Sequence, residues 1–294
     1  MVPMRAFDDS STPDPVVSTI TLPDGGERVV WRHGVGRPLL LIQGLSGTHD
    51  HWGDVLVEHF LKAGRSLVSI NHRGVYRTAR PDPGYSIADL ADDQAAALDV
   101  LGVTEPIDVY GISMGGMTAQ ELTLRHPEKV RTLALGCTTA GGAAMTPPSN
   151  DDMQLLFGAQ QSGDREAAVR VGYEVNFSEP FWADEKTFKR FVELTDLAPV
   201  PVSVILGQLQ AIGGHSTLDR LSEINVPTAI LHGTEDRMLP YPNHAPLHEH
   251  IAGSTMDTFE GAGHLHFWED PERVVQIVQD LSARSHEASP STVA

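Results

Sequence analysis

The 294-residue chain is strongly acidic, with 39 Asp and Glu against 21 Lys and Arg and a formal net charge of −18, which argues against nucleic acid and anionic membranes as partners. Its single cysteine, Cys137, excludes an intrachain disulfide and, at the end of an apolar run, is expected to pack in the core of a protein from a reducing compartment. No secretory signal and no apolar run long enough to span a bilayer is visible, so a cytoplasmic location is expected.

The first half of the chain alternates β-rich and helix-like segments. Residues 1–15 are polar and proline-containing, as in a flexible arm. The β-rich runs 16–22 and 28–33 flank a Pro-Asp-Gly-Gly turn and predict an antiparallel hairpin. The elements expected next are strands at 38–42, 66–71, 106–110 and 130–137, and helices from about 53 to 63, at 87–101 and at 114–126. Such alternation indicates βαβ crossovers and a mostly parallel sheet.

The alternation stops after Cys137 and resumes near residue 227. Residues 138–225 are expected to form an inserted helical cap, with helices at 153–161, 165–174, 184–197 and 202–212. Further strands are expected at 227–232 and 255–259, and helices at 243–251 and 271–283. The predicted architecture is therefore an α/β core of residues 16–137 and 226–284, the cap, and a flexible tail at 285–294.

Residues 111–115 form the motif G-x-S-x-G at a strand-to-helix turn, with Ser113 at its centre. This is the pattern of a nucleophile elbow, in which glycines let the neighbouring backbones approach without a Cβ clash. The serine hydroxyl then points out of the turn beside a helix N-terminus, which favours developing negative charge. Ser113 is the predicted nucleophile.

A serine nucleophile needs a base, and that base needs a group that fixes its tautomer. Asp236 follows the predicted strand 227–232, and His264 lies in a glycine-flanked loop after the strand 255–259. Both positions are carboxyl ends of sheet strands, where open α/β sheets place their sites. Glu235 is the rival acid and His266 the rival base.

The tetrahedral intermediate of acyl transfer also needs hydrogen-bond donors for its oxyanion. The backbone N–H groups of Leu45 and Met114 are the predicted donors, because Leu45 follows Gly44 in the loop after the third strand and Met114 follows the nucleophile.

Together these motifs resemble the α/β-hydrolase superfamily, in its capped esterase, lactonase and C–C hydrolase branch, over about residues 20–283. The resemblance also includes Asn71-His72-Arg73-Gly74, His232-Gly233 and the segment Glu269-Asp270-Pro271-Glu272. Two departures stand out. Gln43 replaces the usual histidine before the oxyanion-loop glycine, and Tyr76 and Arg77 stand where the family's Arg-Gly-x-Gly-x-Ser loop has glycine and a small residue.

The resemblance implies a serine hydrolase that cleaves a carboxylic ester or lactone of a hydrophobic small molecule through an acyl-enzyme, with no metal or organic cofactor, as a monomer or homodimer. The open alternatives are an acyltransferase, a cofactor-free C–C bond hydrolase, and a ligand receptor or biosynthetic scaffold on the same fold. A serine at position 113 argues against dehalogenase and epoxide hydrolase chemistry, which require a carboxylate there.

An apolar pocket is expected between cap and core, lined by aromatic side chains. The expected pocket residues are Gly44, Trp52, Phe157, Phe181, Trp182 and Phe267. His244 and His248 have the spacing of helical zinc ligands, but a solvated helix face is the better interpretation. His49, Asp50 and His51 are expected either to touch substrate or, equally, to include a helix cap at Asp50. Arg73, Arg77 and Arg80 are expected to lie in a surface loop.

Overall fold

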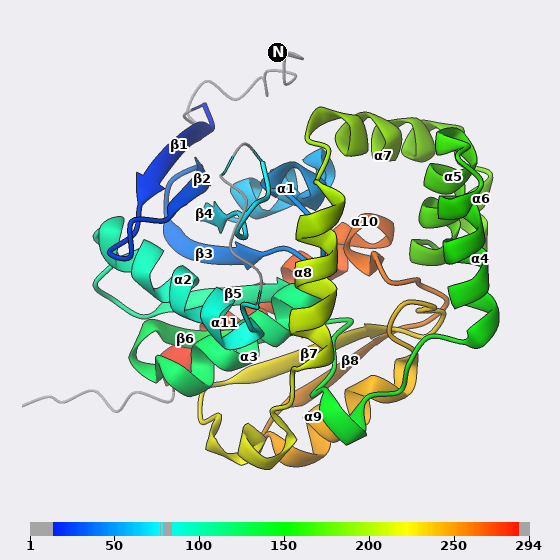
Figure 1. Cartoon of the computed structure of the whole chain (residues 1–294). Helices are drawn as coiled ribbons and strands as arrows, with labels where there is room; N and C mark the ends of the chain where they lie inside the picture. The colour runs from blue at the N-terminus through cyan, green and yellow to red at the C-terminus, as the bar shows by residue number, and fades with distance from the viewer. Residues whose placement is uncertain (1–13, 77, 79–83, 288–294) are drawn as a thin grey trace, which may run out of the picture.

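The computed structural model describes residues 14–76, 78 and 84–287 and shows a layered α/β structure (Figure 1). Its strands are β1 (Val16–Thr21), β2 (Glu27–His33), β3 (Arg37–Ile42), β4 (Arg65–Ile70), β5 (Ile107–Ile112), β6 (Val130–Gly136), β7 (Thr228–Gly233) and β8 (Thr255–Phe259). Its helices are α1 (Asp54–Lys62), α2 (Ile87–Val100), α3 (Met114–Arg125), α4 (Asn150–Gln161), α5 (Arg165–Asn176), α6 (Glu179–Trp182), α7 (Glu185–Leu197), α8 (Val202–Gly213), α9 (His244–His250), α10 (His266–Glu269) and α11 (Pro271–Glu287).

These strands form one sheet in the order β1-β2-β4-β3-β5-β6-β7-β8. The β1–β2 and β2–β4 pairs are antiparallel, and every later pair is parallel. The predicted hairpin and the mostly parallel sheet are therefore both confirmed.

The central strands are buried on both faces, which explains their continuous apolar runs. In β3, Leu40 and Ile42 pack with side chains of α2, α3 and α9, whereas Leu39 and Leu41 pack with side chains of α1 and α11 on the opposite face. The two-residue period of a strand thus divides one apolar sequence between two cores.

Between β6 and β7 the chain forms helices α4 to α8, which lie within the stretch predicted as the cap. In Figure 1, α4 to α7 stand beside the sheet and α8 crosses in front of it. Tyr85, Met114 and Met117 of the core pack with Ala211 of α8, so α8 is attached directly above the start of α3.

The end of the last helix and two short helices differ from the predictions. The flexible tail was expected from residue 285, but α11 continues to Glu287, since no glycine or proline interrupts residues 283–287. The short helices α6 and α10 were not predicted, since four residues are too few to show a hydrophobic period. The predicted arm at residues 1–13 and the end of the tail at 288–294 lie outside the described residues.

In the described part of the chain, no single helix has the length and apolar composition needed to cross a bilayer; α7 and α8 meet those criteria only as a pair, bent by 104°.

Candidate active site

Ser113 occupies the turn between β5 and α3 with φ 58° and ψ −123°, a conformation that side-chain-bearing residues rarely adopt. Two hydrogen bonds hold this backbone: Ser113 N donates to the carbonyl of Gly136 at 2.9 Å, and Thr138 Oγ1 donates to the carbonyl of Ser113 at 2.8 Å. The side chain is half-buried and so accessible from solvent. The surrounding structure therefore maintains a strained serine of the kind found at functional sites.

The glycines on either side of Ser113 are required by close backbone contacts. A Cβ on Gly115 would lie 2.0 Å from the carbonyl oxygen of Ile42, and one on Gly111 would lie 2.3 Å from that of Gly115. Any other residue at either position would force the turn apart, which is the reason the sequence motif suggested.

Asp236 and His264 are joined by a hydrogen bond of 2.7 Å between His264 Nδ1 and Asp236 Oδ2, and both side chains are buried. The other carboxylate oxygen, Oδ1, accepts from the backbone N–H groups of Met238 at 2.9 Å and Leu239 at 2.8 Å. Burial alone would raise the pKa of Asp236, but the charge of His264 and hydrogen bonds from His232 and His264 lower it well below its usual value. A carboxylate that stays ionised requires His264 to carry its proton on Nδ1, which leaves Nε2 free as a base.

The two rival residues are placed elsewhere. Glu235 is exposed to solvent. His266 is fully buried between Tyr110, whose hydroxyl lies 3.2 Å from Nε2, and Cys137, whose Sγ lies 3.2 Å from Nδ1. Burial lowers the pKa of His266 to about 3, so this imidazole is a neutral packing group.

The predicted oxyanion loop lies beside the nucleophile. A Cβ on Gly44 would be 3.6 Å from Ser113 Oγ, and Gly47 N donates to the carbonyl of Gly44 at 3.1 Å, closing a tight turn around Leu45. Met114 is the first residue of α3, where a backbone N–H has no intrahelical acceptor. Gly44, which precedes the predicted donor Leu45, and Met114, which follows Ser113 in the chain, therefore both adjoin the serine.

Gln43 occupies the position before Gly44, where the family usually has histidine. Its Oε1 accepts from Gly44 N at 3.0 Å, and its backbone carbonyl accepts from His72 Nε2 at 2.8 Å. Tyr76, the other departure, has φ 51°, so it adopts the left-handed conformation for which glycine is the usual residue.

The loop that carries His264 is fixed to the inserted helices by Glu269. Its Oε1 accepts from Ser178 N at 2.8 Å and from Gly263 N at 3.1 Å, and its Oε2 accepts from Ser178 Oγ at 2.7 Å. Leu265 N also donates to the carbonyl of Asn176 at 3.0 Å. The turn between α5 and α6 and the histidine loop therefore form one hydrogen-bonded unit, which we call the Glu269 clamp.

Replacing Glu269 with alanine is expected to lower the free energy of unfolding by about 3 kcal/mol, because three donors lose their acceptor. Glu269→Gln is expected to cost far less, because its carbonyl oxygen still accepts from both backbone N–H groups. Thermal or urea unfolding measures both changes, with the exposed Glu260→Gln as the control. Equal destabilisation by alanine and glutamine would contradict this account of the clamp.

The clamp also predicts a pH dependence. Burial raises the pKa of Glu269 above its usual 4.5, and hydrogen bonds from Ser178 and Gly263 only partly oppose this. The part of the contribution of Glu269 to stability that is linked to its protonation is therefore greatest below pH 4.5 and is lost as the pH rises through the raised pKa of the folded state, while the hydrogen bonds that the carboxylate accepts remain. Because glutamine does not titrate, Glu269→Gln should lack this component of the stability profile.

Several of the expected pocket residues lie elsewhere. Trp52 and Phe267 are fully buried, with ring centroids 5.1 Å apart, in the core between the sheet and α1 and α11. The prediction that they contact substrate is wrong, because both rings are completely enclosed in this core. Phe157 is 58% exposed on α4, so it faces solvent in this conformation.

Phe181 and Trp182 belong to an aromatic cluster within the inserted helices. The Phe181 ring stacks on Phe177 with centroids 5.8 Å apart, and Trp182 Nε1 donates to the carbonyl of Phe177 at 2.8 Å. These contacts show that both side chains contribute to packing within the cap. Of the expected pocket residues, Gly44 is the one that directly adjoins Ser113.

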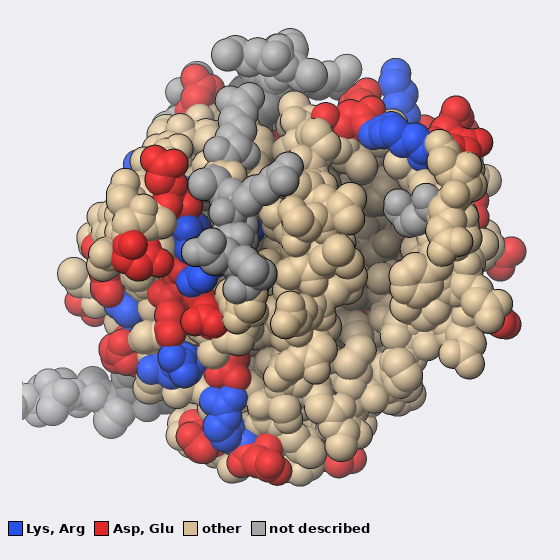
Figure 2. Space-filling model, viewed as in Figure 1, with Lys and Arg blue, Asp and Glu red and all other residues tan. Residues whose placement is uncertain are grey.

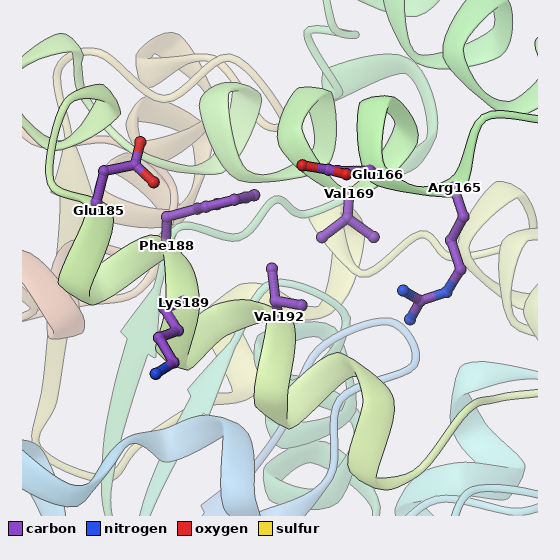
Figure 3. A pocket seen from close by; sticks show the side chains of 7 residues that line it. All are labelled: Arg165, Glu166, Val169, Glu185, Phe188, Lys189 and Val192. Carbon is purple, nitrogen blue, oxygen red and sulfur yellow. The ribbon is translucent and has the colours of Figure 1, made fainter.

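The surface is hollowed between α8 and α4 (Figure 2), and Figure 1 places α10, which closely follows His264 in the chain, behind this hollow. A separate pocket of about 490 Å³ lies between α5 and α7 (Figure 3). Val169, Phe188 and Val192 form its apolar part, and its remaining lining residues are charged. Ser113, Asp236 and His264 do not line it, so it is a groove within the inserted helices, apart from these three residues.

The remaining candidate residues have local structural roles. Each of His244, His248 and His250 directs Nδ1 to a nearby oxygen, which supports the interpretation as a helix face rather than a zinc site. Arg73 binds both carboxylate oxygens of Asp93, at 2.6 and 2.9 Å, instead of facing a substrate. Arg77 and Arg80 lie outside the described residues.

The segment after the oxyanion loop is also structural. Thr48, and not Asp50, is the N-cap of the 3-10 helix His49–Trp52, and His51 Nδ1 accepts from Thr48 N at 3.1 Å. His49 is buried and stacks on Trp31, with ring centroids 5.9 Å apart.

Ligand atoms of Cys137, Asp236 and His264 lie within 4.8 Å of one another, the one such group of three found among the described residues. Metal binding there requires a thiolate, but burial and the negative charge of Asp236 raise the pKa of the Cys137 thiol well above its usual value. The group is thus better described as the hydrogen-bonded pair of Asp236 and His264 with a neutral thiol packed beside it.

Gln208 was not identified from the sequence as a residue that contacts the predicted site. It is fully buried on α8 and its Oε1 accepts from Ser46 N in the oxyanion loop at 2.8 Å. The available signal was a lone amide on the apolar face of a helix, between Val204 and Ala211.

The sequence of this chain is similar to those of known proteins with this fold. The sequence profile of the alpha/beta hydrolase fold family matches residues 37–271. A 2-hydroxy-6-oxononadienedioate/2-hydroxy-6-oxononatrienedioate hydrolase from Pseudomonas sp. is 26% identical over 89% of each chain. A pimeloyl-[acyl-carrier protein] methyl ester esterase from Neisseria meningitidis is 29% identical over 68% of this chain and 80% of its own.

A solved structure shares the same architecture. The esterase EaEST from Exiguobacterium antarcticum superposes with a TM-score of 0.77 at 23% identity, covering 91% of this chain and all of its own. At that identity the likeness is evidence for the fold. Since the family profile spans most of the chain and the sheet order, the elbow and the loops after β7 and β8 agree with it, the chain belongs to the alpha/beta hydrolase fold family.

Proposed function

We propose that this protein is a serine hydrolase that cleaves a carboxylic ester or lactone of a hydrophobic small molecule through an acyl-enzyme on Ser113. The observation that carries the proposal is the 2.7 Å hydrogen bond between His264 and an ionised, backbone-anchored Asp236, in loops at the same sheet edge as the strained Ser113. A carboxylate with a purely structural role has no reason to bind a buried imidazole that leaves its Nε2 free.

In the first half-reaction His264 Nε2 takes the proton of Ser113 Oγ as the oxygen attacks the substrate carbonyl carbon. The tetrahedral oxyanion accepts hydrogen bonds from the N–H groups of Leu45 and Met114, and its collapse breaks the ester C–O bond. His264 then gives its proton to the departing alkoxide. Ionised Asp236 stabilises the imidazolium that exists between these two proton transfers.

In the second half-reaction His264 takes a proton from water as that water attacks the acyl-enzyme. Collapse of the second tetrahedral intermediate breaks the bond to Ser113 Oγ, and the returned proton restores the serine hydroxyl. Every atom of this cycle comes from the ester, water and the three side chains, so it requires no cofactor.

The preference for a hydrophobic substrate is supported by the surface around the hollow. Figure 2 shows few charged side chains on the two elements that border it, and the exposed side chains of α8 include Leu206 and Leu209. Apolar walls of this kind favour an apolar acyl or alcohol group.

The test is reaction with a fluorophosphonate followed by intact-mass and peptide mass spectrometry, alongside hydrolysis of p-nitrophenyl esters of increasing acyl length. We expect one adduct, on Ser113, and turnover that depends on acyl length. Labelling without turnover would favour a receptor or scaffold, and transfer to an added alcohol in place of hydrolysis would favour an acyltransferase.

A C–C bond hydrolase is the second candidate, because the Pseudomonas relative is named as such a hydrolase and is similar to this chain over most of its length. The same triad would then act on a carbon–carbon bond next to a ketone. A kcat/KM for a 2-hydroxy-6-oxo dienoate more than about 100-fold above that for the best simple ester would decide for this candidate.

A further inference from the structure

A buried histidine at the end of β7 is bound to the loop that carries Asp236. His232 is completely inaccessible, and its Nε2 lies 2.8 Å from the carbonyl oxygen of Leu239. Because a carbonyl oxygen can only accept a hydrogen bond, His232 must carry its proton on Nε2. The strand therefore donates one side-chain hydrogen bond to the backbone three residues after Asp236.

The same N–H also approaches the carboxylate itself. His232 Nε2 is 3.4 Å from Asp236 Oδ2, the oxygen that accepts from His264 Nδ1 at 2.7 Å. Leu239 connects the two side chains more directly, because its N–H donates to Asp236 Oδ1 at 2.8 Å while its carbonyl accepts from His232. The contact to Oδ2 is long for a hydrogen bond, so His232 acts on Asp236 chiefly through the backbone of Leu239.

Packing fixes the direction of the His232 N–H. Its ring meets the ring of Tyr241 edge-on, with centroids 5.8 Å apart and planes at 87°, and the Tyr241 hydroxyl lies 2.7 Å from Thr258 Oγ1 on β8. The preceding residues 229–231 of β7 are apolar and buried. An aliphatic side chain could fill the same core without a buried polar group, so the imidazole is explained best by the hydrogen bond that it donates.

We propose that His232 is a positioning residue for the catalytic acid, which holds the Asp236 loop so that Oδ2 stays directed at His264 Nδ1. This inference rests on the proposed hydrolase function and deepens it. His232 acts through Asp236 and not on the substrate, because its ring is completely enclosed.

The experiment compares two amide variants, His232→Gln and His232→Asn. The amide nitrogen of glutamine reaches about as far from the backbone as imidazole Nε2, whereas that of asparagine reaches only as far as Nδ1 and falls short of Leu239. The kcat and KM for p-nitrophenyl butyrate are measured for each, with circular dichroism to check folding. His248→Gln, which changes an exposed histidine on α9, is the matched control.

We expect His232→Asn to lower kcat by about 10- to 100-fold with KM changed less than about threefold, and His232→Gln to keep about a third or more of the wild-type kcat. The control should behave as wild type. If His232→Asn does not fold, His232→Leu takes its place in the comparison with His232→Gln. Equal losses in the glutamine variant and the variant without the donor, or no loss in either, would overturn the inference.

A double-mutant cycle separates positioning of the acid from general packing. His232→Asn is combined with Asp236→Asn, and acylation is followed in single turnovers with enzyme in excess over ester. Because Asp236→Asn leaves no carboxylate to position, His232→Asn should cost less than about threefold in that background. A loss of the same size in both backgrounds would show that His232 only supports packing, and the inference would be wrong.

The fluorophosphonate adduct distinguishes the two levels of the argument. Wild-type protein that labels at Ser113 and hydrolyses the ester, together with equal losses in both backgrounds of the cycle, contradicts the role of His232 alone. Wild-type protein that neither labels nor hydrolyses the ester overturns the hydrolase function and this inference with it.

Discussion

Ser113→Ala is expected to lower kcat/KM for p-nitrophenyl butyrate by about 10⁵-fold or more, because no other group can form the acyl-enzyme. The thermal midpoint should stay within about 2 °C, since the hydroxyl takes part in none of the hydrogen bonds that hold the turn, which involve only the backbone of Ser113. Steady-state hydrolysis measures the first effect and a thermal scan the second.

The control is Ser162→Ala, an exposed serine at the end of α4, purified in the same way. It should retain full activity, which excludes a contaminating esterase as the source of turnover. If Ser113→Ala retained more than a tenth of the wild-type rate, the nucleophile would have to be another residue.

Asp236→Asn is expected to reduce kcat by about 10⁴-fold with little change in stability. Oδ1 of residue 236 accepts from two backbone N–H groups, so the amide oxygen of asparagine must stay there and its NH₂ must face His264 Nδ1. His264 Nδ1 must then accept a hydrogen bond from the asparagine NH₂. The imidazole proton therefore moves to Nε2, the nitrogen that has to act as the base.

The pH–rate profile tests this account of the Asp236→Asn variant. Because the defect is the wrong tautomer, activity should recover in part at alkaline pH, where hydroxide can assist the attack. Glu235→Gln, an exposed neighbour, should behave as wild type. Loss of activity in Glu235→Gln with an active Asp236→Asn would reverse the assignment of the acid.

The parts of this structure that were predictable are those encoded by neighbouring residues. The apolar runs of β3, β5, β6 and β7 show their burial on both faces without reference to anything distant in the chain. The elbow could be predicted because its five-residue motif is local and Gly111 is required by the turn itself, although Gly115 is required by the backbone at the end of β3, a strand distant in the chain. The order of strands and loops then places Asp236 and His264 at the same sheet edge as Ser113.

What could not be predicted depends on contacts between distant segments. Trp52 and Phe267 are 215 positions apart in the chain, yet their rings contact each other in the core. No feature of the neighbouring sequence distinguishes such a core aromatic from one that lines a pocket. Gln208 and Ser46 meet only because α8 folds over the core. The left-handed backbone of Tyr76 is rare for a residue with a side chain, so the sequence of this loop did not indicate it.

The Glu269 clamp has a consequence for how a substrate enters. Two segments of the insertion are bound in different ways: the α5–α6 turn to the histidine loop, and α8 to the oxyanion loop through Gln208. The insertion cannot swing away as a rigid lid without pulling on both halves of the catalytic apparatus. The first helix of the insertion is attached as well, because Arg237 Nε, next to Asp236, donates to Asp152 Oδ1 of α4 at 2.7 Å. Entry of a substrate and the geometry of all three loops are therefore coupled through one insertion.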